Sequence, residues 1–419
     1  MTDNLSYVFV NLNNQDHLVG KLWFHQNNGK QSTSFKYDEL WLKSDYCYPL
    51  DPFLQLVETT YHTESPKILF GPFTDCAPDT WEKKLATSNE MLKAKQEKRA
   101  RRMLSEFDYL MAVNDFARQG ALRFKTEIDG DFVNANEKEA IPPLVQLPKL
   151  LKASENLLED KNTASSLKLL LEPGSSLGGA RPKASVIDNH GNLCIAKFPK
   201  KNDSNNNVLW EFVALTLAKE AGLNVQEFSL EKVHDKAVLI LKRFDREGNK
   251  RIPFCSGMTM LNASDGQSGE FSYLNLADII RTYSTNVIED LKELWSRILF
   301  SVLISNTDDH LRNHGFLWER EGWNLSPLYD VNPSDDNTEF LQLNIDDTTN
   351  SAEVEVVFEV ADYFGLSKTS AQEIINLQRK VISKWQSVAI SIGLSCCAIS
   401  YMKAAFSKGN SKGRIAYPL

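Results

Sequence analysis

Residues 301–334 read SVLISNTDDHLRNHGFLWEREGWNLSPLYDVNPS, and they place several polar residues between apolar segments. Residues 291–303 repeat apolar side chains at the three-and-four spacing of a helix with one buried side. Two short apolar runs follow at residues 315–318 and 323–326, separated by charged residues and a glycine, which is the pattern of a β-hairpin. We therefore predict a helix that ends at Asn306, then a polar loop and a hairpin.

Polar side chains stand at both ends of this hairpin. Asp308, His310 and Asn313 precede its first strand, and Asp330 follows its second. In phosphoryl transfer, a protein has to orient a hydroxyl nucleophile and to neutralise phosphate charge through magnesium. A loop Asp does the first task, and an Asn five residues later with an Asp beyond a hairpin does the second. This order and spacing are typical of the catalytic half of a kinase, with Mg²⁺ held by oxygen ligands.

The same residue types are common in ordinary turns and helix caps. Any one of these residues taken alone is explained equally well in that way. The ordered set of helix, Asp, Asn, hairpin and Asp favours the kinase interpretation. A kinase also needs a nucleotide-binding half, which should lie elsewhere in the chain.

A candidate for that half lies upstream. Residues 172–186, EPGSSLGGARPKASV, form a Ser/Gly-rich loop followed by a predicted strand, and a second strand at residues 193–198 carries Lys197. A loop of small residues lets backbone N–H groups approach phosphates, and a strand lysine adds a point charge. Glu211 lies on a predicted helix at residues 207–221, where protein kinases place a glutamate that pairs with the strand lysine. The alternative is a plain hairpin with a solvated lysine and a surface glutamate.

The remaining sequence predicts regular structure on both sides of these segments. We expect a β-rich module in residues 1–60, helices in 79–116, 144–171 and 361–407, a buried strand in 236–244 and a loop-like region in 252–269. The uncharged run 385–402 contains a Gly-Leu-Ser break and is therefore expected to form two buried helices instead of a membrane span. With 419 residues the chain is long enough for two or three domains.

The composition argues against several classes of function. A formal net charge of −8 disfavours a protein that grips nucleic acid by its own phosphate contacts, so DNA association is expected only through a partner. We interpret the basic run at residues 93–102 as a solvated helix face. None of the six cysteines has C-x-x-C spacing, and the N-terminus has no secretory signal, which favours reduced thiols in a cytoplasmic protein. The histidines show no zinc-ligand spacing.

Three blocks together resemble the HipA family of bacterial Ser/Thr kinases, the toxin partners of HipB-type antitoxins. They are SSLGGARPKA at residues 175–184, NTDDHLRN at 306–313 and LSPLYD at 325–330. The N-terminal part also resembles that family at VGKL (19–22), YPL (48–50), PDTW (78–81) and RQGALRF (118–124). The resemblance covers nearly the whole chain, and its motifs are specific in combination.

The resemblance implies an α+β, bilobal, protein-kinase-like fold with a small β-rich N-terminal subdomain and a mainly helical C-terminal lobe. It implies an N-terminal subdomain at residues 1–125, a nucleotide-binding lobe at 126–245 and a catalytic lobe at 246–419. ATP and Mg²⁺ are the cofactors that it implies.

It also implies roles for single residues. The expected catalytic residues are Asp308, which would orient the substrate hydroxyl, His310 and Asn313. The expected metal ligands are Asn313 and Asp330. The expected nucleotide-binding residues are Ser176, Gly178, Gly179, Lys183, Lys197 and the helix glutamate Glu211.

In this family, a serine just before the Gly-Gly pair is a site of inhibitory autophosphorylation. Ser176 matches that position, with Ser175 beside it. A phosphoryl dianion there would repel the nucleotide phosphates that the loop should hold. The alternative is that both serines are small turn residues. Asp309 stands where some relatives have glycine, and its carboxylate is expected either to affect metal occupancy or to face solvent.

Three functions remain open at this point. The first is an active Ser/Thr protein kinase toxin, neutralised by a HipB-like helix-turn-helix antitoxin; substrates in the family include aminoacyl-tRNA synthetases. The second is a non-catalytic, kinase-like subunit that tunes the DNA affinity of a repressor, which the intact set of catalytic residues disfavours. The third is a small-molecule kinase, against which the SSLGG loop and its Pro-Lys tail argue.

Overall fold

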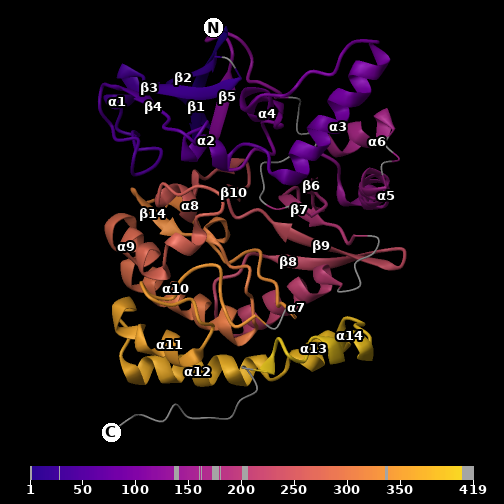
Figure 1. Ribbon diagram of the computed structural model, residues 1–419, viewed down its shortest axis with the longest axis vertical. Coiled ribbons are helices and arrows are strands. Elements are labelled where there is room, and N and C mark those ends of the chain that lie inside the picture. Colours follow the sequence, from indigo (N-terminus) through magenta and orange to yellow (C-terminus); the bar gives the residue numbers. More distant parts are fainter. Residues whose placement is uncertain are drawn as a thin grey trace. The chain divides into compact units, whose positions relative to one another are not determined.

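The computed structural model describes residues 2–27, 29–135, 141–159, 161, 163–171, 179, 181–200, 206–335 and 338–407. The chain forms two compact units, whose elements are labelled in Figure 1. The first unit consists of residues 1–202 and 230–255, and the second of residues 203–229 and 256–419. The predicted domain boundaries near residues 125 and 245 stay predictions.

The first unit contains an antiparallel five-stranded sheet in the order β4-β3-β2-β1-β5. Its strands are β1 (Thr2–Leu12), β2 (Gln15–Asn27), β3 (Lys30–Tyr37), β4 (Thr60–His62) and β5 (Leu122–Lys125), with the short helices α1 (Glu39–Leu42) and α2 (Gly71–Asp75) between them in the chain. Leu22 and Phe35 lie directly opposite each other on β2 and β3 and are fully buried. Such cross-strand apolar pairs stabilise a sheet with one buried face. The predicted β-rich module in residues 1–60 is confirmed.

A second sheet has the order β6-β7-β9-β8. Its strands are β6 (Lys183–Ile187), β7 (Leu193–Lys197), β8 (Phe228–Val233) and β9 (Lys236–Lys242). The helices of this part of the chain are α3 (Thr80–Gln96), α4 (Glu106–Ala112), η2 (Leu144–Gln146), α5 (Leu147–Leu158) and α6 (Ala164–Leu171). One apolar core joins α3, α5 and α6 to the sheet, through residues such as Trp81, Leu150, Leu167, Val186 and Ile240. The helices and strands predicted here are confirmed. Their apolar residues recur at regular spacing because one side of each element packs into this shared core.

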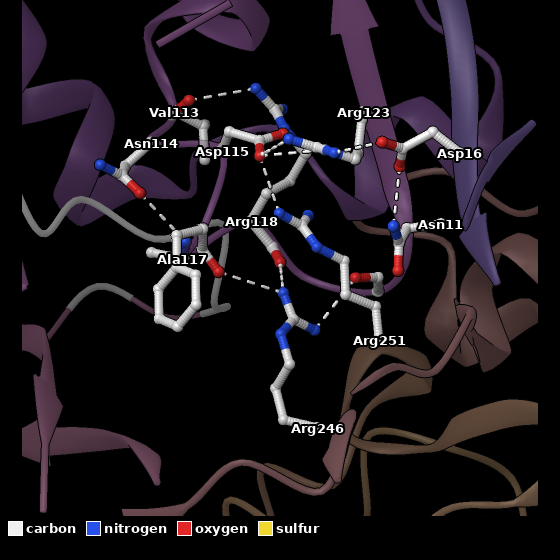
Figure 2. A network of polar contacts seen from close by, with 12 residues as sticks. Asn11, Asp16, Val113, Asn114, Asp115, Ala117, Arg118, Arg123, Arg246 and Arg251 are labelled. Atoms are coloured by element: carbon white, nitrogen blue, oxygen red, sulfur yellow. Dashed lines mark hydrogen bonds and ion pairs between the residues drawn. The ribbon is translucent and has the colours of Figure 1, made fainter. Parts of the chain in front are cut away.

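A buried network of charges joins residues 114–123 to residues 243–251 in the first unit, and Figure 2 shows much of it. The second segment includes the short strands β10 (Arg246–Glu247) and β11 (Lys250–Arg251). Asp245 accepts hydrogen bonds from Arg243 Nε (2.6 Å), Arg246 Nη1 (2.8 Å) and the backbone N–H of Gly120 (2.7 Å). Burial raises the pKa of Asp245, but the two guanidinium groups outweigh it and bring the pKa to about 2. Asp245 is therefore a buried, ionised carboxylate.

Arg118 and Asp115 form the other part of this arginine network (Figure 2). Arg118 is fully buried and donates hydrogen bonds of 2.9–3.1 Å to the backbone carbonyls of Cys76, Leu110 and Val113. Asp115 Oδ2 accepts hydrogen bonds from Arg123 Nη2 and Arg251 Nη2, each at 2.8 Å. The motif at residues 118–124 is thus explained by structure, since its two arginines and its glycine all bond within this network.

The second unit is mainly helical. Its elements are α7 (Asn207–Glu220), α8 (Gly257–Met260), η3 (Ser268–Glu270), α9 (Tyr273–Tyr283), α10 (Val287–Leu303), η4 (Leu311–Asn313), β13 (Gly315–Glu319), β14 (Gly322–Leu325), α11 (Val354–Glu359), η5 (Ala361–Phe364), α12 (Lys368–Ile382), α13 (Trp385–Ser391) and α14 (Cys396–Tyr401). Helix α10 is the core, and its last turns are buried on all sides. The yellow helices α11 to α14 follow one another along one side of this unit (Figure 1). The predicted helix at residues 291–303 and the predicted hairpin are confirmed.

Two predictions about local structure are wrong in part. Residues 252–269 are not simply a loop, because they contain the strand β12 (Phe254–Ser256) and α8, whose residues are buried. The glycines there suggested a loop, and the apolar residues between them went into the core instead. The run 385–402 does form two helices, but Cys396, Cys397 and Tyr401 are exposed, so α14 is buried on one side only. Among the described residues, no helix combines the length and the apolar character that a membrane span requires.

Candidate active site

The end of α10 places the catalytic loop. Ser305 follows the helix with a left-handed φ of +54°, and the N–H of Asn306 returns to the carbonyl of Ser301 at 2.8 Å. The N–H of Ser305 also bonds to the carbonyl of Val302, so the helix ends in a Schellman motif. The chain thereby turns sharply at the buried end of α10, which stops at Leu303 instead of running on to Asn306 as predicted, and Asn306 lies in the loop.

Asp308 and Asn313 are held together by the loop itself. Asp308 is exposed, whereas Asn313 is 6% exposed at the end of η4. The amide nitrogen of Asn313 donates to the backbone carbonyl of Asp308 at 3.0 Å. Since that bond uses the nitrogen, the amide oxygen is the atom of this side chain that suits a hard cation.

The segment that carries Asp330 is bonded to the same loop. Asn332 donates its backbone N–H to Asn306 Oδ1 and its amide nitrogen to Asp330 Oδ1, each at 3.3 Å. The N–H of Ser334 bonds to the carbonyl of Ser305 at 2.9 Å. Asp330 has a left-handed φ of +55°, a conformation that costs a non-glycine residue free energy and is common at functional sites. The second unit thus brings the predicted residues Asp308, Asn313 and Asp330 into one site.

Asp309 points into the protein. It is 5% exposed, so the expectation that its carboxylate could face solvent is wrong. Its Oδ2 accepts hydrogen bonds from the hydroxyls of Tyr273 (2.7 Å) and Ser301 (3.4 Å), and its Oδ1 lies 3.1 Å from Nε2 of His314. Burial raises the pKa of Asp309, but His314 and Tyr273 outweigh it and lower the pKa below its usual value. Burial and Asp309 together raise the pKa of Tyr273 well above its usual value.

Two further loop residues have distinct surroundings. His310 is half-buried, and its Nδ1 has no hydrogen-bond partner among the residues that the structure describes. Its predicted catalytic role stays a prediction. Arg312 offers its backbone carbonyl to the hydroxyl of Tyr329 at 2.6 Å, which adds another bond between the loop and the segment before Asp330.

The predicted nucleotide-binding residues lie in both units. Lys197 is half-buried on β7, directly across from Lys183 on β6. Glu211 is only 3% exposed on α7, so it is not the surface residue that a helix glutamate usually is. Because Lys197 and Glu211 belong to different units, their pairing stays a prediction.

Lys183 has partners in the first unit. It is 3% exposed, and its Nζ lies 2.6 Å from Asp79 Oδ2 and 3.0 Å from the carbonyl of Gly179. Asp79 also caps α3, because its Oδ1 accepts hydrogen bonds from the N–H groups of Trp81 and Glu82. Lys183 therefore links the backbone of Gly179 to Asp79 at the start of α3. The predicted residues Ser175, Ser176 and Gly178 lie outside the described residues.

The oxygen atoms of Asn313 and Asp330 fit magnesium. Mg²⁺ is usually bound through one or two protein oxygen ligands, with water and substrate phosphates completing its shell. Among the described residues, no group of three His, Cys, Asp or Glu side chains is arranged to hold a metal ion.

The sequence alone gave no supporting role to five residues that hold this site together. They are Tyr273, Ser301, Asn306, His314 and Asn332. Ser301 breaks an otherwise apolar face of the predicted helix, and Asn332 follows Asp330 by two residues. A buried polar side chain needs a hydrogen-bond partner. A polar residue on an apolar helix face was therefore the signal from which a supporting role could have been predicted.

Comparison with known proteins agrees with the geometry. The family model of the HipA-like C-terminal domain matches residues 175–385, just over half of the chain. The chain belongs to the HipA family. Its fold agrees with this membership, since it superposes with a TM-score of 0.67 on a chain from the Shewanella oneidensis structure of the toxin-antitoxin system of HipA, HipB and its operator DNA. That match covers 96% of both chains at 17% identity, and the predicted α+β, kinase-like fold is confirmed.

Curated relatives of this HipA-family chain are distant. It is 26% identical over 187 residues to a Haemophilus influenzae protein named "Putative kinase", covering 38% of this chain and 52% of that protein. It is 24% identical over 206 residues to the serine/threonine-protein kinase toxin HipA of Shewanella oneidensis, covering 42% of this chain and 48% of that protein. The chain thus spans about half the length of the curated relatives that it matches.

Proposed function

We propose that this chain is an ATP- and Mg²⁺-dependent Ser/Thr protein kinase that acts as the toxin of a toxin-antitoxin pair. The observation that carries the proposal is the hydrogen-bonded loop of the second unit. Within it, Asn313 bonds to the backbone of Asp308, and Asn332 bonds to both Asn306 and Asp330. Family membership and the kinase names of the relatives support the same reaction class.

The residues of this loop have separate tasks in the proposed reaction. Asp308 is exposed and orients the acceptor hydroxyl, accepting its proton as the oxygen bonds to the γ-phosphorus and the bond from that phosphorus to the leaving ADP breaks. Asn313 and Asp330 hold Mg²⁺ through their side-chain oxygens. The chemistry that bound Mg²⁺-ATP supplies is the transferable phosphoryl group and the positive charge that offsets its oxygens. Lys197 adds a point charge for the nucleotide phosphates.

The experiment that tests this proposal measures which acceptor receives phosphate. Purified protein is first treated with a phosphatase, then incubated with Mg²⁺ and γ-labelled ATP alone, with cell lysate, or with an aminoglycoside. We expect label on lysate proteins and on the chain itself, with peptide mapping placing the latter on Ser175 or Ser176. Label on the aminoglycoside alone would support a small-molecule kinase, and ATP binding without transfer would support a non-catalytic subunit.

A variant of the metal site adds a second readout. We expect Asp330→Asn to need more Mg²⁺ for half-maximal transfer and to lose rate by about 10²-fold or more, because a carboxylate ligand is removed. Asp235→Asn, an exposed residue of the β8–β9 turn, is the matched control and should behave as wild type. Equal behaviour of the two variants would contradict Asp330 as a metal ligand.

The proposed partner is a HipB-like helix-turn-helix antitoxin, and any contact with operator DNA would come through it. The Shewanella oneidensis structure holds HipA, HipB and operator DNA together, which supports the proposal for this chain. A net charge of −8 argues against strong DNA binding by the chain alone. Co-expression with a candidate helix-turn-helix antitoxin and a mobility-shift assay test this, with DNA retained only when both proteins are present. An aminoacyl-tRNA synthetase is the protein substrate to test first.

A further inference from the structure

The catalytic loop contains two adjacent carboxylates with opposite surroundings. Asp308 is exposed, whereas Asp309 is 5% exposed. The chain turns at Thr307 and Asp308, so that the carboxylate of Asp308 lies at the surface and that of Asp309 lies in the core. The mechanism proposed above gives Asp309 no chemical task. Burying an ionised carboxylate costs free energy unless hydrogen-bond or charge partners compensate it. We therefore asked what the partners of Asp309 do.

We propose that Asp309 is a positioning residue that fixes the geometry of Asp308 and Asn313. This inference rests on the kinase function proposed above. Asp309 lies one residue after Asp308, and its contact His314 lies one residue after Asn313. The 3.1 Å approach of Asp309 Oδ1 to His314 Nε2 therefore closes the loop at its base, with residues 310–313 between them.

The other partners of Asp309 anchor this closed loop to the two central helices. Tyr273 begins α9 and donates its hydroxyl at 2.7 Å, and Ser301 lies in the last turns of α10 at 3.4 Å. Ser301 in turn accepts from the amide of Asn306 at 3.3 Å, and Asn306 accepts from the N–H of Asn332. One carboxylate thus connects both helices, both ends of the loop and, through Asn306 and Asn332, the segment that carries Asp330.

Position matters greatly in this reaction class, since phosphoryl transfer depends almost wholly on orientation and electrostatics. A displacement of about 1 Å in a reacting group costs about 10²-fold in rate. Removing Asp309 leaves the residues that touch substrate unchanged but takes away the side-chain hydrogen bonds that join the middle of the loop to Tyr273 and Ser301. The expected defect is therefore in kcat, with the KM for ATP nearly unchanged, because Asp309 is not expected to touch the nucleotide.

The test compares Asp309→Ala, Asp309→Asn and Tyr273→Phe with wild type. We expect Asp309→Ala to lower kcat about 10- to 100-fold with the KM for ATP within about threefold. Asparagine accepts from the hydroxyl of Tyr273 and donates to an imidazole nitrogen, so Asp309→Asn should recover most of the rate. Tyr273→Phe removes one hydrogen bond and should lower kcat about threefold to tenfold.

A control separates positioning from general loss of stability. Gln378→Ala removes another fully buried side chain of the second unit, whose Nε2 donates to the carbonyl of Ser296 on α10 at 2.8 Å. It should lower Tm about as much as Asp309→Ala while leaving kcat near that of wild type. A fall in kcat that follows Tm across all these variants would overturn the proposal.

Amide hydrogen exchange gives a readout that does not depend on activity. The N–H of Asn313 is bonded to the carbonyl of His310 at 2.8 Å, so its exchange reports the order of the loop. We expect its protection to be lost in Asp309→Ala and kept in Asp309→Asn and Gln378→Ala. Unchanged protection in Asp309→Ala, or equal loss in Asp309→Asn, would overturn the proposal. If wild type transfers no phosphate but exchange changes as expected, the kinase function fails and the positioning role stands.

Discussion

The two units each contain a buried polar network, and the two networks are built from different groups. The arginine network of the first unit uses full charges, and it joins residues far apart in sequence, such as Arg246 to the carbonyl of Arg118 at 2.5 Å. The loop network of the second unit relies mainly on neutral hydroxyls, amides and backbone groups around the buried carboxylate of Asp309. Breaking a buried ion pair costs about 3–5 kcal/mol, whereas one neutral hydrogen bond is worth about 1 kcal/mol. The comparison therefore predicts that the first network sets stability and the second sets catalytic geometry.

The largest expected effect is the loss of Asp245. Asp245→Ala leaves Arg243 and Arg246 buried without their carboxylate, so we expect the free energy of unfolding to fall by about 3–5 kcal/mol. Urea denaturation measures this directly. Asp235→Ala, at an exposed position of the same unit, should change stability by less than about 0.5 kcal/mol. Similar results for the two variants would show that the arginine network does not set stability.

The pH dependence of stability gives a second test of Asp245 and its arginine partners. The pKa of Asp245 is about 2 in the folded protein and about 3.9 in an unfolded chain. Its contribution to stability is thus complete above about pH 4 and is lost as the pH falls towards 2. The difference in unfolding free energy between wild type and Asp245→Asn should therefore shrink over that range. A difference that stays constant from pH 5 to pH 2 would contradict an ionised, charge-paired Asp245.

A glycine pair tests how tightly the arginine network is packed. Gly120 has a φ of +72°, and a Cβ added there would lie 3.1 Å from the backbone nitrogen of Phe254. Gly248 has a φ of +57° with nothing within 4 Å. Both substitutions to alanine pay for the left-handed backbone, about 1–2 kcal/mol, but only Gly120→Ala also displaces its neighbours. We expect Gly120→Ala to lower the unfolding free energy by at least about 1 kcal/mol more than Gly248→Ala, and equal losses would mean that the packing at Gly120 is loose.

Asn306 tests the loop network of the second unit. Asn306→Ala removes a side chain that is 2% exposed and bonds to both Ser301 and the Asn332 backbone, so we expect a stability loss of about 1–3 kcal/mol. The rate of phosphate transfer should fall by about tenfold or more, because the Asp330 segment loses its tie to the loop. Asn350→Ala, which loses a bond to the carbonyl of Leu341 at 2.8 Å, should lose stability with little change in rate. A rate that falls equally in both variants would break the distinction between the networks.

The smallest expected effect concerns Glu82 at the start of α3. Burial, and then the neighbouring Asp79, raise its pKa well above the usual value. A raised carboxyl pKa contributes stability below the unfolded value of about 4.3, and that contribution is lost as the pH rises. Glu82→Gln should therefore gain Tm relative to wild type as the pH rises from about 4.5 to 8. A gap that does not grow over this range would contradict a raised pKa for Glu82 in the folded protein.

Local patterns in the sequence were sufficient for the elements that position the site. The helix at residues 291–303, the hairpin after it and the order of Asp308, Asn313 and Asp330 all depend on short-range spacing, which the sequence records directly. The buried position of Asp309 is different. Two adjacent aspartates are equivalent in sequence, and only the placement of α9 and α10 decides which one enters the core.

Long-range polar contacts could not be predicted for the same reason. Arg118 and Arg246 appear in the sequence as ordinary charged residues near turns, yet both are buried among backbone carbonyls. Lys183 was expected at the nucleotide, and its ammonium group is bonded to Asp79, more than a hundred residues earlier. The glycines of residues 252–269 suggested a loop, whereas residues 252–260 form one continuous buried run, which shows neither the helical nor the strand period. Each of these outcomes depends on a partner that lies far away in the chain.

The assignment of Asp308 as the catalytic residue is tested by the rate of γ-phosphate transfer from Mg²⁺-ATP, measured for phosphatase-treated wild type and Asp308→Asn. We expect Asp308→Asn to fold with the Tm of wild type, to bind ATP still, and to transfer phosphate at least about 10³-fold more slowly. The exposed control Asp235→Asn should transfer at the rate of wild type. Transfer by Asp308→Asn at the rate of wild type would contradict the assignment of this loop as the catalytic centre.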